Sequence, residues 1–167
     1  MAKKLIAAAA ATVLWVALTC SAATAATGNQ TFRIVFTGDP HAGAVGQVFM
    51  TGVINAVGSD RNVGSTENPD GSVTDLDQVT LPGGSITIRN VETVDSFDLD
   101  PTTCVARISA SGPWTVSAAT GRYGGSSGGG TFMAKATVLF GRSAGGCSET
   151  PLFFFAIATV IGTITVP

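Results

Sequence analysis

Apolar and polar residues alternate one by one over long stretches of the chain, a pattern typical of half-buried β-strands. The longest strict alternation lies in residues 131–140, which place Phe132, Ala134, Ala136, Val138 and Phe140 on one face and Met133, Lys135, Thr137 and Leu139 on the other. Residues 31–37 alternate in the same way. Both segments are predicted to be strands that turn one face toward a core.

Further strands are expected where similar patterns lie between turn residues. The segments concerned are 45–57, 73–81, 85–91, 104–110, 114–118 and 151–166. Pro82-Gly83-Gly84 predicts a hairpin turn between two of them, and Asn68-Pro69-Asp70-Gly71 predicts a turn at the end of a polar loop over 58–71. The acidic segment 92–100 carries Phe97 and Leu99 on one alternation.

These segments favour an all-β domain, because no stretch after the N-terminal segment shows convincing helical periodicity. About eight strands separated by turn residues predict either a sandwich or a closed sheet. Glycines inside strand patterns, such as Gly46 and Gly52, are typical of bulges and of a strongly coiled sheet. We therefore expect an eight-stranded antiparallel β-barrel.

The last predicted strand, residues 151–166, is apolar on both of its faces. Such a strand is expected to be covered by the core on one side and by another subunit on the other. The competing interpretation is a C-terminal membrane helix. It is disfavoured because the segment is short, rich in β-branched residues and interrupted by Gly162.

The N-terminal segment has the pattern of a secretory signal peptide. A charged start with Lys3 and Lys4 precedes an apolar run over 5–18, and small residues ending in Ala23-Thr24-Ala25 follow. We expect residues 1–26 to be the signal, cut after Ala25 or Ala26, and residues 27–167 to form a single secreted domain. A lipid anchor on Cys20 is disfavoured, because lipid modification needs a small residue just before the cysteine, and Leu18 and Thr19 fit this pattern poorly.

The amino-acid composition and charge disfavour two classes of binding partner. Without Lys3 and Lys4, seven basic residues stand against 11 acidic ones, and no basic patch remains. This balance argues against nucleic acid and against an anionic membrane as partners. The abundance of glycine and the sparse charge are typical of a strand-rich domain with many turns.

Two cysteines remain once Cys20 is removed with the signal. Cys104 and Cys147 are expected to pair as a disulfide in an oxidising compartment. A metal site or a catalytic thiol is the alternative, but the chain has one histidine and no CxxC motif. We predict no metal and no cofactor.

Several residues could carry chemistry and are better explained by local structure. His41 follows Pro40 in a turn and is interpreted as solvated, although Asp39 is adjacent. Three serines, Ser126, Ser127 and Ser143, match G-x-S-x-G, yet no helix is expected after them, as a nucleophile elbow requires. The glycines of 124–130 lack the lysine and the helix of a phosphate-binding loop.

Two acidic runs could bind calcium, and the aromatic residues could line a cavity. The runs contain Asp60, Glu67, Asp70, Asp75 and Asp77, and Glu92, Asp95, Asp98 and Asp100. Neither fits a calcium-binding loop, so both are interpreted as solvated strand ends and loops. The aromatic set is Phe32, Phe36, Phe49, Phe132, Phe140 and Trp114. Its strand spacing favours an ordinary core over a ligand cavity.

One glycine-rich stretch resembles a known family. Residues 120–128 (TGRYGGSSG), followed by Gly130-Thr131-Phe132, are similar to the T-G-x-Y/F-x-G-A-x-G-x-G-x-F segment of the allene oxide cyclase and dirigent barrels, a superfamily with many exported bacterial members of unknown role. The segment Leu81–Ile86 is similar to a strand-turn-strand of those bacterial proteins. The matched motif positions are Gly121, Tyr123, Gly125, Gly128, Gly130 and Phe132.

The resemblance implies an eight-stranded antiparallel barrel with an apolar interior cavity, often assembled as a trimer through outer strand faces. It implies no activity, because the acidic, basic and tyrosine side chains of the family's pockets have no matched positions here. Tyr123 falls in the motif's aromatic position, which anchors the turn. A homo-oligomer is therefore expected, and the catalytic residues stay unknown.

Three functions are consistent with these patterns. The leading hypothesis is a secreted barrel that binds a small hydrophobic molecule in its interior, without strong catalysis. The second is an enzyme of cyclase or dirigent type that steers a reactive hydrophobic intermediate; it predicts inward ionisable side chains such as Arg89, Arg107 or Asp98. The third is a structural or cell-surface assembly protein whose barrel is filled by its own side chains.

Overall fold

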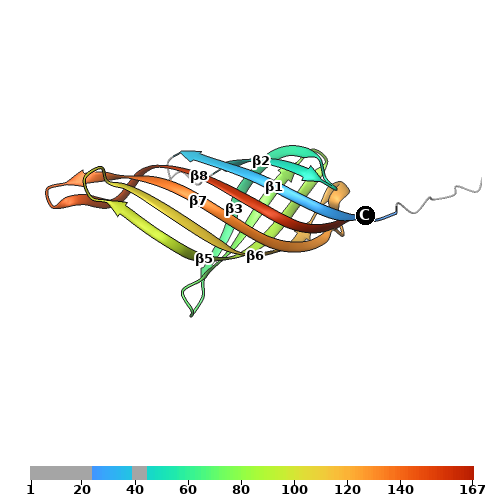
Figure 1. Cartoon of the computed structure of the whole chain (residues 1–167). Coiled ribbons are helices and arrows are strands. Elements are labelled where there is room, and N and C mark those ends of the chain that lie inside the picture. The colour runs from blue at the N-terminus through green and yellow to red at the C-terminus, as the bar shows by residue number, and fades with distance from the viewer. Residues whose placement is uncertain (1–23, 39–44) are drawn as a thin grey trace, which may run out of the picture.

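The computed structural model describes residues 24–38 and 45–167 and confirms an all-β fold there. The strands are β1 (Ala26–Gly38), β2 (Val45–Gly52), β3 (Ala56–Glu67), β4 (Val73–Leu81), β5 (Gly84–Asp100), β6 (Val105–Ala119), β7 (Ser127–Ser143) and β8 (Gly146–Val166). Each strand pairs antiparallel with the next one along the chain, and β8 pairs with β1, so one sheet closes into a ring (Figure 1). The predicted signal peptide, residues 1–26, lies mostly outside the described residues, which begin at residue 24.

Within the described residues, helical structure is limited to a single 3₁₀ turn, η1 (Gly121–Tyr123), between β6 and β7. No helix in that part of the chain is long and apolar enough to cross a membrane. The predicted turns at Pro82-Gly83 and at 68–72 are both present, joining β4 to β5 and β3 to β4.

Two predictions around β3 are wrong. Residues 45–57 form two strands instead of one, because the chain turns at Gly52, where φ is 134° and the Asn55 side chain bonds to both backbone groups of Gly52. The polar segment 58–71 is mostly strand, since β3 continues to Glu67 and pairs with both β2 and β4. Backbone pairing holds this strand although its side chains are polar on both faces.

Two other predicted boundaries are absent. Residues 85–91 and 92–100 form the single strand β5, and residues 104–110 and 114–118 belong to the single strand β6. Register shifts between Thr87 and Ile88 and between Val94 and Ser96 accommodate the bending of these long strands. The ring therefore has the expected eight strands, but β5 and β6 are longer than the sequence indicates.

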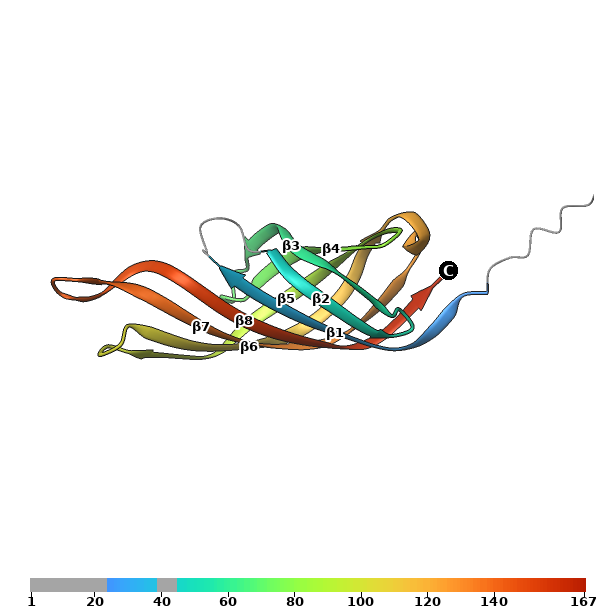
Figure 2. The same cartoon turned by 90° about the horizontal axis from the view of Figure 1, so that it is seen from above.

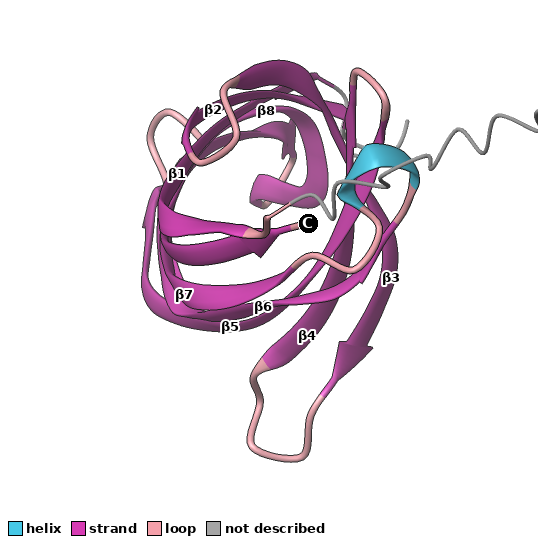
Figure 3. Ribbon diagram, turned by 90° about the vertical axis from the view of Figure 1, so that its right-hand side faces the viewer, coloured by secondary structure: helices cyan, strands magenta, loops and turns pink. Residues whose placement is uncertain are grey.

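The ring has two different ends. The β5–β6 and β7–β8 hairpins extend far beyond the ring at one end, and the last residue of β8 lies at the other (Figures 1 and 2). Cys104 and Cys147 join these two hairpins by a disulfide, with Cα atoms 5.3 Å apart. We call the end with the extended hairpins the open end. The opposite end, where η1 and the β4–β5 turn lie, is the filled end (Figure 3).

Apolar side chains fill the ring at the filled end. The buried residues there include Phe32, Val48, Met50, Ile54, Val79, Leu81, Ile86, Ile88, Trp114, Tyr123 and Ile164. The rings of Phe32 and Trp114 pack edge to face, 5.4 Å between centroids. This packing closes one end of the ring's interior and leaves space only toward the other.

Candidate functional site

A cavity of about 240 Å³ lies inside the ring toward its open end. Its polar wall comes from β3, β4 and β5, and its apolar wall from β1, β7 and β8. The lining residues are Asp60, Asn62, Asp75, Asp77, Asn90 and Glu92 on the polar side and Ile34, Phe36, Phe132, Ala134, Phe154, Ala158 and Val160 on the apolar side. The interior is thus divided between carboxylates and hydrocarbon.

Strand alternation carries the carboxylates into the interior. On β4, Asp75 and Asp77 share a face with the buried Val79 and Leu81. Cross-strand pairing shows the same continuity, because Val79 lies opposite Ile86 and Asp77 lies opposite Ile88. The acidic residues therefore continue the inward face of the apolar core toward the open end.

Asp60 is the most isolated of these carboxylates. Its side chain is 1% exposed, and neither carboxylate oxygen has a hydrogen-bond partner. Burial, together with the charge of Asp77, raises the pKa of Asp60 to about 7, and the nearby backbone N–H of Arg61, which does not reach hydrogen-bond geometry, opposes this rise only in part. A buried carboxyl group without a partner is costly to keep ionised, so Asp60 holds a proton in mildly acidic solution.

Asp77 is the partnered counterpart of Asp60. The amide of Asn90 donates to Asp77 over 2.5 Å, and the amide of Asn62 donates to Asp77 over 3.2 Å and to Asp75 over 3.0 Å. Burial and the neighbouring Asp75 raise the pKa of Asp77 to about 6 despite these bonds. Burial also raises the pKa of Glu92, with the charges of Asp75 and Asp77 adding to the effect.

The arrangement offers hydrogen-bond acceptors and negative charge against an apolar face. No lysine or arginine is among the cavity's lining residues. Among the described residues, no group of three or more histidine, cysteine or acidic side chains has the geometry to hold a metal ion. The cavity can therefore accept hydrogen bonds from a ligand and pack against its hydrocarbon part.

The first part of the predicted motif, around Gly121 and Tyr123, lies in the turn η1 at the filled end. Tyr123 is buried and donates its hydroxyl to the Pro82 carbonyl over 3.2 Å, while the Arg122 guanidinium lies 4.9 Å from its ring centre. Gly121 has φ of 60°, and a side chain there would collide with the Gly83 carbonyl. These contacts hold the turn between β6 and β7, the role that the family resemblance implies for Tyr123.

The remaining motif positions lie in the first part of β7 and just before it. A Cβ at Gly130 would collide with the Ile161 carbonyl, and one at Gly162 would come within 2.8 Å of the Trp114 ring. Trp114 instead fills this space and donates its indole N–H to the Ile161 carbonyl over 3.0 Å. Gly125 and Gly128, also in the motif, have positive φ. Phe132 is the one motif residue that lines the cavity.

Other candidate residues serve local structure. The Ser126 hydroxyl donates to the Tyr123 carbonyl, and Ser143 donates to the Gly146 carbonyl. Asp70 and Asp100 accept hydrogen bonds within their own turns, and those bonds hold the pKa of each carboxyl group below its usual range. His41 and Asp39 lie outside the described residues.

The ionisable residues named for an enzyme do not point inward. Arg89, Arg107 and Asp98 are all exposed, so this version of the cyclase or dirigent hypothesis is abandoned. The interpretation of the acidic runs as solvated is also wrong for Asp60, Asp75, Asp77 and Glu92, which the structure brings together in the cavity. Alternation indicates this position for Asp75 and Asp77, which share a strand face with Val79 and Leu81, whereas β3 is polar on both faces and gives no such signal for Asp60.

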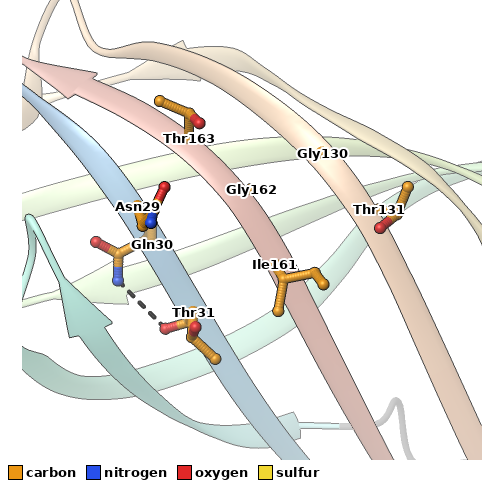
Figure 4. Close-up of a pocket in the computed structure, with 8 residues that line it drawn as sticks. All are labelled: Asn29, Gln30, Thr31, Gly130, Thr131, Ile161, Gly162 and Thr163. Carbon is orange, nitrogen blue, oxygen red and sulfur yellow. Dashed lines mark hydrogen bonds between the residues drawn. The ribbon is translucent and has the colours of Figure 1, made fainter.

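A second depression lies on the outer surface, where β1, β8 and β7 run side by side. Its lining residues are Asn29, Gln30, Thr31, Gly130, Thr131, Ile161, Gly162 and Thr163 (Figure 4). Gln30 points inward and is fully bonded to backbone groups, and the remaining members are small or exposed. This groove offers no charged or unpartnered buried group, so the interior cavity is the stronger candidate.

Comparisons with known proteins return no relative from which a role could be transferred. No protein-family model matches the chain, and no curated protein or solved structure matches it. The chemistry of the site is therefore argued from the geometry of the cavity alone.

Proposed function

We propose that this protein is an exported β-barrel that binds a small molecule with a hydrophobic part in its interior, of the allene oxide cyclase and dirigent-like type. The supporting observation is the cavity with an apolar wall formed by Phe36, Phe132 and Phe154. At about 240 Å³ it lies just below the roughly 300–1,000 Å³ of common ligand sites, which suits a small ligand. The disulfide between the extended hairpins is consistent with export.

The cavity also bears on the alternative of a filled structural barrel. A single water needs only about 10–15 Å³, so the space exceeds what one or two trapped waters occupy. Apolar side chains pack together at the filled end of the ring, but a space of about 240 Å³ remains toward the open end. A protein that only needed a stable barrel would gain stability by filling that end as well.

Filling the cavity tests this function. Ala134 lines the cavity, so Ala134→Phe places an added ring inside it, whereas Thr131→Phe adds the same ring to an exposed position of β7. Ligand-observed NMR with toluene should show binding to the wild type and to T131F, and none to A134F. Equal toluene binding by all three proteins would place the ligand outside the barrel and contradict the proposal.

A weakly catalytic role is a second candidate, favoured by Asp60. A carboxyl group with a pKa of about 7, facing an apolar cavity, is suited to general acid–base chemistry near neutral pH. Turnover of a candidate substrate that is lost in Asp60→Asn, while toluene binding stays intact, would support this role. Unchanged turnover in D60N would exclude Asp60 as the acid or base.

We also propose self-association through the outer face of β7 and β8. Large apolar side chains are exposed there: Met133, Leu139, Phe153, Phe155 and Ile161. The occupant proposed is a second copy of this chain, with a trimer expected from the family resemblance. Sedimentation should show that Met133→Glu with Phe155→Glu lowers the oligomeric state, whereas Val57→Glu on the exposed face of β3 leaves it unchanged.

A further inference from the structure

The polar wall of the cavity contains a buried acceptor that no part of the described protein satisfies. Asp60 is 1% exposed, lines the cavity and has two carboxylate oxygens without any hydrogen-bond partner. The apolar wall stands across the same space. We infer that the interior ligand is a small hydrophobic amine, whose ammonium group is bound by Asp60 and whose hydrocarbon part packs on the phenylalanines of the opposite wall.

This inference rests on the proposed function and specifies the ligand's charge. The titratable groups facing Asp60 are Asp75 and Asp77 on β4 and Glu92 on β5, and all of them are acidic. The lining residues from β1, β7 and β8 are apolar and carry no charge. An anion would meet only repulsion in this cavity, while a cation is attracted by every ionised group in it.

The hydrogen-bonding pattern favours an amine over a metal ion. Asp75 and Asp77 are already held by the amides of Asn62 and Asn90, whereas Asp60 is free to accept. Together the carboxylates do not reach the geometry of a metal site within the described residues. An ammonium group needs only acceptors and a neighbouring apolar surface for its carbon atoms. The cavity supplies both.

Binding of a cation changes the protonation of the site in a defined direction. In mildly acidic solution Asp60 carries a proton, because burial raises its pKa to about 7. The ammonium group stabilises the ionised form of Asp60, so binding expels that proton to the solvent while the amine keeps its own. The O–H bond of the Asp60 carboxyl group is broken, and no other covalent bond changes. Calorimetry in buffers of different ionisation heat measures the released proton directly.

Three phenyl compounds that differ only in the head group test the inference: phenethylamine, phenethyl alcohol and phenylpropionate. At about pH 7 the amine is expected to bind roughly 10–100-fold more tightly than the neutral alcohol, the range for one hydrogen bond to a charged group. The anion should bind most weakly. At about pH 5 the preference for the amine should shrink, because ionising Asp60 then opposes binding.

Variants separate this inference from the proposed function. Asp60→Asn should remove the amine preference and the proton release while leaving alcohol binding intact. Asp98→Asn, which removes the same charge from an exposed position, should change neither. Thermal unfolding verifies that both variants fold, and Asp77→Asn offers a second, milder test in which the preference is reduced but not lost.

The possible outcomes distinguish a failure of the amine inference from a failure of the proposed binding function. Equal affinity for amine and alcohol, or tighter binding of the anion, would overturn the amine inference and leave the binding function standing. Absence of binding by all three compounds, together with no effect of A134F on toluene, would overturn both. An amine preference that survives D60N would assign the charge recognition to other residues and refute the role given to Asp60.

Discussion

Gln30 at the filled end and Asp60 on the wall of the cavity are both 1% exposed, and they differ in their hydrogen bonding. The Gln30 amide donates to the carbonyls of Thr51 and Ile54 over 3.0 Å each, and its oxygen accepts from the Ile54 N–H over 2.8 Å. Asp60 has no partner for either oxygen. The satisfied group fixes a turn of the chain, whereas the unsatisfied one is available to a ligand.

The same contrast extends to the aromatic residues of the two ends. Trp114 is 1% exposed, bonded through its indole N–H and packed on Phe32. Phe36 is only half-buried and borders the cavity. Packing at the filled end therefore accounts for stability, and incomplete packing at the open end leaves room for a ligand.

The largest expected effect is at the filled end. Trp114→Ala should lower the free energy of unfolding by roughly 3–5 kcal/mol, because it leaves a large void and removes a buried hydrogen bond. Phe36→Ala, the matched aromatic truncation at the open end, should cost only about 1–2 kcal/mol. Denaturant titration of both variants measures the difference, and equal losses would contradict the division into two ends.

The next effect is the pH dependence that Asp60 imposes. Between about pH 4 and pH 7 the folded state keeps a proton on Asp60 that the unfolded state has lost, since the pKa is raised from 3.8 to about 7. The free energy of unfolding should therefore fall as the pH rises, by roughly 2–3 kcal/mol between about pH 5 and pH 8.

Asp60→Asn is the matching variant for this pH profile. It should flatten the profile, leaving the smaller slopes due to Asp77, whose pKa is raised to about 6, and to Glu92, whose pKa burial also raises. Asp98→Asn should keep the wild-type slope, because that carboxyl group is exposed. A wild-type stability that rises over the same range would show that Asp60 does not carry a raised pKa.

The smallest effect sharpens the comparison between the two buried polar residues. Gln30→Leu should destabilise the protein by about 2 kcal/mol, because the backbone groups of Thr51 and Ile54 lose their partners inside the core. The shift should be independent of pH, unlike that of D60N. Thermal unfolding of the variant at two pH values checks this, and a loss that varied with pH would contradict it.

Alternation in the sequence predicts the strands that have a continuous apolar face, and it fails where that face becomes polar. Val48 and Met50, or Phe132 and Ala134, indicate both a strand and its inward side. The segment that holds Asp60 gives no such signal, because polar residues stand on both faces of β3. Backbone pairing with its two neighbours decides its conformation, and pairing between distant segments cannot be read from local pattern.

The positions of the carboxylates in the cavity can likewise be predicted only in part from the sequence. On β4, the inward position of Asp75 and Asp77 can be predicted from their alternation with Val79 and Leu81, whereas that of Asp60 on β3 cannot. Acidic residues are usually exposed to solvent, and this general tendency favours the solvated interpretation when only the sequence is considered. Only the closed sheet shows that β3, β4 and β5 bring these residues to the same space.

The pairing of Ala26 with Val166 at the seam between β1 and β8 has a practical consequence. It places the C-terminal residue at the filled end (Figure 1), whereas the cavity lies toward the open end. A linker attached at Pro167 would immobilise the protein with its open end facing the solution. An electrode or sensor chip loaded in this orientation would present every binding site to the analyte.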